Sequence, residues 1–160
     1  MKKIKYLAFA VIIVLLSVFL LYKSFIFYQI PFNPIKEYAS ESVVDFHITK
    51  NLANGEGVNI SCHDAHTCGL VLDYLSNLKL VPLKDKEAYK ILKFENNTYY
   101  TGMLVLEDSE KIFISDLSID SPNILRISSS ITRFKDGYYK IVDSTFDYDY
   151  IYDLISETKE

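Results

Sequence analysis

The feature that most constrains this chain is an uncharged apolar run near its N-terminus. Residues 6–22 read YLAFAVIIVLLSVFLLY, a run of 17 residues without a charged side chain. As a helix such a run extends roughly 26 Å, close to the ~30 Å hydrocarbon core of a bilayer. Lys5 and Lys23 flank it, and their long apolar stems let the charges reach the headgroups. The run therefore predicts one membrane-spanning helix, with membrane contact over residues 4–28.

Aromatic residues and prolines follow the run. Aromatic side chains are enriched at membrane interfaces, and in this chain they are Phe25, Phe27, Tyr28 and Phe32. Pro31 and Pro34 are expected to end the helix, because proline lacks a backbone N–H. Residues 29–42 are then a short, stiff and extended tether between the membrane and a domain at 43–160.

A cleaved signal peptide is the main alternative, because Lys2, Lys3 and Lys5 resemble its basic start. The candidate cleavage sites are poor: 8–10 lies too early, and 38–40 has Glu37 before it where a small residue is required. We therefore expect an uncleaved anchor. Its basic start is expected to keep the N-terminus in the cytoplasm and the domain outside, in a bacterial periplasm or envelope.

The charge distribution limits the partners of the exported part. Four of the 17 basic residues precede residue 29, whereas all 21 acidic residues follow it, so 13 basic residues face 21 acidic ones and the net charge is −8. Such a charge excludes most nucleic-acid roles and opposes adsorption of the domain to an anionic surface. The length after the tether suits one small domain.

Alternating polar and apolar residues predict a strand-rich domain. Strands are expected at 43–50, 58–60, 89–95, 99–107, 111–117, 123–135 and 138–143, with Asp136-Gly137 as a tight hairpin turn between the last two. Apolar residues at helical spacing predict one main helix over about 65–80, ended by Pro82, and a short helix over 149–157. The predicted fold class is α+β: an antiparallel sheet of about six or seven strands packed by one main helix.

Both cysteines and two of the three histidines lie within eight residues, 61–68 (SCHDAHTC). An even pair of cysteines in an oxidising compartment predicts a disulfide between Cys62 and Cys68. If Ser61 capped the helix, both cysteines would lie in it, with about 9 Å of rise between them, too far for a disulfide. The disulfide therefore requires Asp64 as the N-cap and a helix that begins at about Ala65.

Other interpretations of this cluster remain open at this point. Cys62 and His66 at i, i+4, and His63 and His66 at i, i+3, would share a helical face and form a weak metal-site pattern. A catalytic thiol would need a lowered pKa and a histidine next to it, for example Cys68 beside His63 or His66. Unpaired structural cysteines are a further possibility.

Two other groups of residues have a simple structural interpretation. The tail from Asp143 to Asp153 mixes tyrosines with carboxylates, which is typical of a solvated acidic face or a protein-binding patch rather than an EF-hand calcium loop. His47 is expected to be an ordinary surface histidine. The sequence contains no phosphate loop, nucleophile elbow or H-E-x-x-H motif.

These observations predict a single-pass, non-enzymatic protein of the bacterial envelope, without a cofactor, whose exported domain binds another envelope protein. The alternative is a ligand-binding or metal-binding sensor domain that uses Cys62, His63, His66 and Cys68. An exported enzyme is the least supported interpretation, because no catalytic constellation is recognisable.

Overall fold

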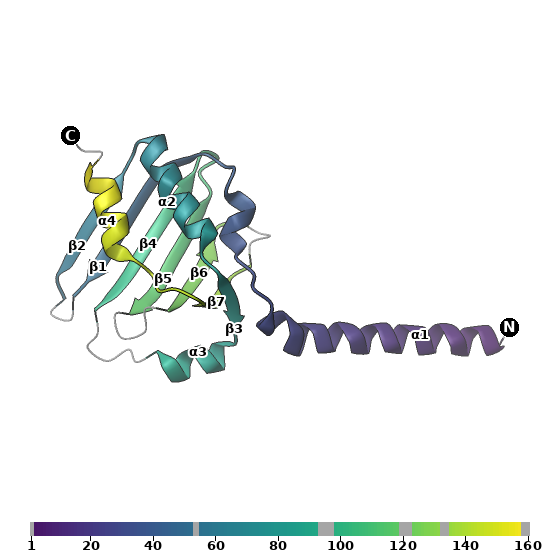
Figure 1. Cartoon of the computed structure of the whole chain (residues 1–160). Helices are drawn as coiled ribbons and strands as arrows, with labels where there is room; N and C mark the ends of the chain where they lie inside the picture. The colour runs from purple at the N-terminus through teal and green to yellow at the C-terminus, as the bar shows by residue number, and fades with distance from the viewer. Residues whose placement is uncertain (1, 53–54, 93–97, 119–122, 132–134, 158–160) are drawn as a thin grey trace.

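The computed structural model describes residues 2–52, 55–92, 98–118, 123–131 and 135–157 (Figure 1). It begins with helix α1 (Lys2–Leu21), which continues through a π-helical turn, η1 (Tyr22–Ile26), and a 3-10 turn, η2 (Phe27–Gln29). Ile4–Gln29 forms one apolar segment, and its most apolar 18 residues have a mean hydropathy of 2.7 and no buried residue among them. This segment is long and apolar enough to cross a membrane, a property that signal sequences share.

A seven-stranded antiparallel sheet forms the body of the domain. Its strands are β1 (Val43–Asn51), β2 (Gly57–Cys62), β3 (Leu80–Leu83), β4 (Tyr99–Leu106), β5 (Lys111–Ser118), β6 (Ile124–Ser129) and β7 (Gly137–Ile141), in the spatial order β2-β1-β4-β5-β6-β7-β3. The predicted α+β class is confirmed. Strand β3 is the edge nearest α1, and β2 is the edge farthest from it (Figure 1). We call these the near edge and the far edge.

The helices α2 (Ala65–Asn77) and α4 (Tyr148–Glu157) cover one face of the sheet (Figure 1). Strand alternation sends every second side chain to this face, where it meets the apolar side of α2. The register places Phe46 opposite both Cys62 and Leu104, and Leu104 opposite Ile112. These residues pack with Val71, Leu72 and Leu75 of α2 in the main core. The predicted main helix and the predicted tail helix are therefore confirmed.

The tether differs from its expected extended conformation. Pro34–Tyr38 form a 3-10 helix, η3, because Pro34 suits a first helical turn and the Asn33 side chain accepts a hydrogen bond from Ile35 N–H. Ile35 is fully buried in the main core. The Asn33 amide also donates to the carbonyls of Leu75, Ser76 and Leu78 at 2.8–3.1 Å. This part of the tether is thus built into the domain and caps the end of α2.

One predicted strand is wrong. Residues 85–91 of the described chain form helix α3 (Asp85–Ile91), where the alternation at 89–95 had predicted a strand. Asp85 and Glu87 in its first turn favour the helix through their charge at its N-terminus. Ala88 and Leu92, four residues apart, pack with Ile124 and Tyr138 in a small second core on the other face of the sheet. Residues 93–95 lie outside the described part.

Two further boundaries differ from the predicted ones. The main helix ends at Asn77, earlier than predicted, and the chain then enters β3, a strand that the sequence did not reveal because it contains Pro82. Strand β6 ends at Ser129, whose N–H donates to Asp136 Oδ1, so Asp136-Gly137 is not a two-residue hairpin turn. Gly137 instead pairs with Ile127 in the ladder. Residues 132–134 of this connection lie outside the described part.

Candidate functional site

The cysteine and histidine cluster lies where β2 passes into α2. Asp64 is the N-cap of α2, and its Oδ1 accepts a hydrogen bond of 2.7 Å from Thr67 N–H. This bond lowers the pKa of the Asp64 carboxyl, because it stabilises the charged form. The helix begins at Ala65, as the disulfide requires, and Cys62 is the last residue of β2.

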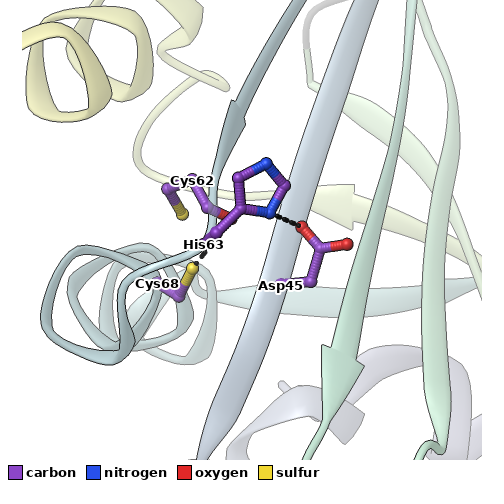
Figure 2. A network of polar contacts seen from close by, with 4 residues as sticks. All are labelled: Asp45, Cys62, His63 and Cys68. Carbon is purple, nitrogen blue, oxygen red and sulfur yellow. Dashed lines mark hydrogen bonds and ion pairs between the residues drawn. The ribbon is translucent and has the colours of Figure 1, made fainter. Parts of the chain in front are cut away.

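The two cysteines point into the core. Both are buried free thiols, and Cys68 Sγ donates to the carbonyl of Cys62 at 3.2 Å (Figure 2). Burial raises the pKa of both thiols, and a hydrogen bond between the two raises that of Cys62 further. Both therefore stay protonated at neutral pH. The two thiols lie close together, so the Cys62–Cys68 disulfide stays a prediction. An activated nucleophile needs a lowered pKa, whereas the pKa of both thiols is raised.

The histidines point the other way. Because side chains alternate along a strand, His63 emerges on the side opposite Cys62, where its Nδ1 lies 3.0 Å from Asp45 Oδ1 (Figure 2). His66 is exposed on the first turn of α2. His47 is half-buried on β1, two residues after Asp45, and therefore lies on the same face of the sheet as Asp45. The i, i+4 spacing of Cys62 and His66 does not place the two side chains on one helical face, because Cys62 precedes the helix.

Metal ligation and catalysis both need convergent groups. Among the described residues, no three His, Cys, Asp or Glu side chains gather closely enough to hold a metal ion. Three surface cavities of about 230, 250 and 220 Å³ are lined without a cysteine or a histidine. The 61–68 segment forms the corner between β2 and α2, with its thiols in the core and the side chains of His63 and His66 in solvent.

A second candidate site is an aromatic surface at the far edge. It consists of six rings from three elements and the segment before α4: Tyr74, Tyr100, Phe146, Tyr148, Tyr150 and Tyr152. Tyr100 and Tyr148 stack with centroids 4.6 Å apart, and Lys50 Nζ lies 5.9 and 5.5 Å from these two rings. We call this set the far-edge aromatic surface.

One hydrogen bond joins the start of helix α4 to α2, and a second caps the first turn of α4. The Tyr74 hydroxyl accepts from Asp147 N–H at 2.8 Å, and Asp147 Oδ1 accepts from Tyr150 N–H at 2.9 Å. Tyr148 is buried, but Tyr150 and Tyr152 remain 46% and 43% exposed, with the exposed carboxylates of Asp149 and Asp153 beside them in the helix. The result is a helix docked against α2 that exposes tyrosines and negative charge to the solvent.

The sequence identified only part of this surface. The tyrosines of the tail were visible in one segment, but Tyr74, Tyr100 and Lys50 come from α2, β4 and β1. Strand pairing of Lys50 with Tyr100 brings the last two together. No local pattern signals that pairing.

Comparison with known proteins gives no relative. No protein-family model matches the chain, and no curated protein or solved structure shows a significant similarity to it.

Proposed function

We propose that this chain is a single-pass membrane protein whose exported α+β domain binds another protein of a bacterial envelope. In this proposal the N-terminus lies in the cytoplasm, residues 4–28 cross the inner membrane, and the domain stands outside. The role is non-enzymatic. The observation that carries the proposal is the far-edge aromatic surface. Helix α4, which carries its exposed tyrosines, lies on the side of the domain away from α1 (Figure 1).

The anchor is supported by the way the chain leaves it. Phe32 N–H donates to the Leu80 carbonyl at 2.7 Å, Asn33 caps α2, and Ile35 fills the core. Cleavage near residues 38–40 would remove all three contacts from the domain. An uncleaved span retains them and also retains Lys2, Lys3 and Lys5, which favour an N-terminus in the cytoplasm.

The binding role is supported by the chemistry of the exposed rings. Tyrosine is enriched at protein interfaces, because it buries a large apolar ring while its hydroxyl keeps a polar partner. Tyr150 and Tyr152 sit on a helix that is already ordered, so little conformational entropy is lost on binding. Asp149 and Asp153 beside them favour a partner with a basic rim.

The edge strand β2 adds to this surface. An edge strand presents unpaired backbone groups, and β2 lies beside α4 at the far edge. A partner that contacts Tyr150 and Tyr152 is therefore within reach of a strand with backbone hydrogen-bonding capacity.

Site-specific photocross-linking tests the proposal. A photoreactive phenylalanine analogue replaces Tyr150 or Tyr152 in the full-length chain within bacterial membranes, and Tyr99 as a matched control. Tyr99 is 45% exposed, close to the exposure of the two test positions, but lies on β4. We expect one discrete adduct from positions 150 and 152 and none from position 99. Equal adducts at all three positions, or none at any, would overturn the proposed surface.

We also propose that Cys62 and Cys68 form a disulfide once the domain reaches an oxidising compartment. A thiol count on the denatured chain, with and without reductant, tests this directly. Two thiols that appear only after reduction would establish the disulfide. Two free thiols without reduction would refute it.

A further inference from the structure

A cavity of about 220 Å³ lies where the apolar helix meets the domain. Its walls come from two parts of the chain that are more than 100 residues apart: Phe19, Tyr22, Lys23, Phe27 and Tyr28 on one side, and Lys135 on the other. We call it the junction pocket. It combines aromatic walls with two ammonium groups and contains no carboxylate in its lining.

The cations around the pocket are held by aromatic rings rather than by acids. Lys135 Nζ lies 3.6 Å from the centroid of Phe27 and 5.5 Å from that of Phe32. Lys84, next to this site, lies 5.4 Å from Phe25 and 5.1 Å from Tyr28. The ion pairs found in the described part of the chain join Asp45 to His63 and Lys79 to Asp143, and none involves Lys23, Lys84 or Lys135.

Two of these lysines, Lys84 and Lys135, belong to the exported part, which carries a net charge of −8. Together with Lys23 of the apolar segment they place three cations at the membrane end of an acidic domain. Cation–π contacts position an ammonium group but do not neutralise it. The cluster therefore keeps its capacity for a negatively charged ligand.

The depth of the pocket indicates the ligand. If Ile4–Gln29 spans the membrane, Lys23 lies at the level of the lipid phosphates on the side of the domain, and Phe19 lies one helical turn deeper, toward the acyl chains. A phosphate between Lys23 and Lys135 would satisfy both cations, while Phe19 and Tyr22, on the membrane side of Lys23, would contact the glycerol and the first acyl carbons. A free phosphate ion would leave these aromatic walls without a partner.

We propose that the junction pocket binds the headgroup phosphate of an anionic phospholipid from the leaflet that the domain faces. Lys23 and Lys135 are its counter-ions, and the aromatic side chains form the apolar part of the site. Such a lipid holds the near edge against the bilayer and leaves the far edge pointing away from it. The inference rests on the proposed membrane anchorage but not on the proposed protein partner.

Native mass spectrometry of the full-length chain in detergent tests the site. The chain is incubated with an equimolar mixture of phosphatidylglycerol and phosphatidylcholine of the same acyl length. From two lysines at a membrane surface, each contributing about 1 kcal/mol, we expect about a thirtyfold preference for the anionic lipid. The double variant Lys23→Gln and Lys135→Gln should lose this preference, and the matched variant Lys111→Gln, at an exposed lysine of β5, should retain it.

Three results would overturn the proposal: equal retention of both lipids by the unchanged chain, a preference that persists in the double variant, or displacement of the lipid by low millimolar inorganic phosphate. The last result would assign the pocket to a free phosphate. Near-UV circular dichroism checks that the double variant is folded. Cross-links at positions 150 and 152 are independent of this test, so each proposal can fail without the other.

Discussion

The near edge and the far edge of the sheet are built differently. At the near edge the chain that leaves the apolar helix is tied to the domain through Phe32, Asn33 and Ile35, with lysines over aromatic rings around it. At the far edge, α4 is fixed by Tyr74 and Asp147 but leaves Tyr150 and Tyr152 in solvent. The first set of contacts is used for folding and attachment, and the second leaves side chains free for a partner.

This difference has an energetic consequence. Substitutions at the near edge should lower the stability of the domain, because they remove buried contacts. Substitutions of the exposed tyrosines at the far edge should leave stability almost unchanged and affect binding alone. Stability is best followed by near-UV circular dichroism of the tyrosines during urea unfolding of the full-length chain in detergent, where the apolar helix stays folded.

The largest effect is expected for Ile35→Ala. Ile35 is fully buried, so its truncation should lower the free energy of unfolding by about 2–5 kcal/mol. Ile30→Ala is the matched control, because Ile30 is 47% exposed and five residues earlier in the same segment. Equal, small effects at both positions would show that the tether is not part of the folded domain.

The next effect is expected for Asn33→Ala. Its amide donates to three carbonyls at the end of α2, and the loss of these partners should cost about 1–3 kcal/mol. Asn77→Ala is the control, because the Asn77 amide bonds only to Asp73 among the described contacts, in an exposed position. A stability loss no larger than that of the control would contradict the capping role of Asn33.

Reduction of the proposed disulfide should have a smaller effect. Closing so short a loop stabilises a fold by about 2 kcal/mol in the chain-entropy treatment. Reductant should therefore lower the urea midpoint of the unchanged chain but not that of Cys62→Ser. An identical midpoint with and without reductant in the unchanged chain would contradict the disulfide.

The smallest effect on stability is expected for Tyr150→Ala and Tyr152→Ala. Substitutions of exposed residues change the free energy of unfolding by about 0.5 kcal/mol or less. With a photoreactive residue at position 150, Tyr152→Ala should nevertheless weaken the adduct at least severalfold. If Tyr152→Ala unfolds the domain, the far edge is structural and the comparison between the two edges is wrong.

Much of the fold follows from local patterns, and the exceptions are instructive. The apolar helix, the main helix and most strands have clear periodicities. The sequence also showed that a Cys62–Cys68 disulfide requires Asp64, and not Ser61, as the N-cap of the main helix. The sequence did not predict helix α3, because seven residues are too few to show a clear helical periodicity. This helix is stabilised by the packing of Ala88 in the second core. Strand β3 was missed because proline is unusual in strands, and it is tolerated at a sheet edge.

The candidate sites show a sharper division. The 61–68 segment is conspicuous in sequence, yet strand alternation sends Cys62 inward and His63 outward, so the residues do not converge. The junction pocket has no local signature, and the far-edge aromatic surface has one only in the tyrosines of the tail, because each joins segments that only the tertiary fold brings together. Sequence proximity drew attention to the 61–68 segment, whereas long-range contacts build the other two sites.

The measurement that tests the account most directly is the intact mass of the chain recovered from carbonate-washed bacterial membranes. An uncleaved anchor predicts a membrane-bound product of about 18.5 kDa that retains the apolar helix. A shorter product released into the soluble fraction, beginning between residues 23 and 40, would show that the helix is a removed signal sequence. The membrane attachment and the junction pocket would then both be wrong.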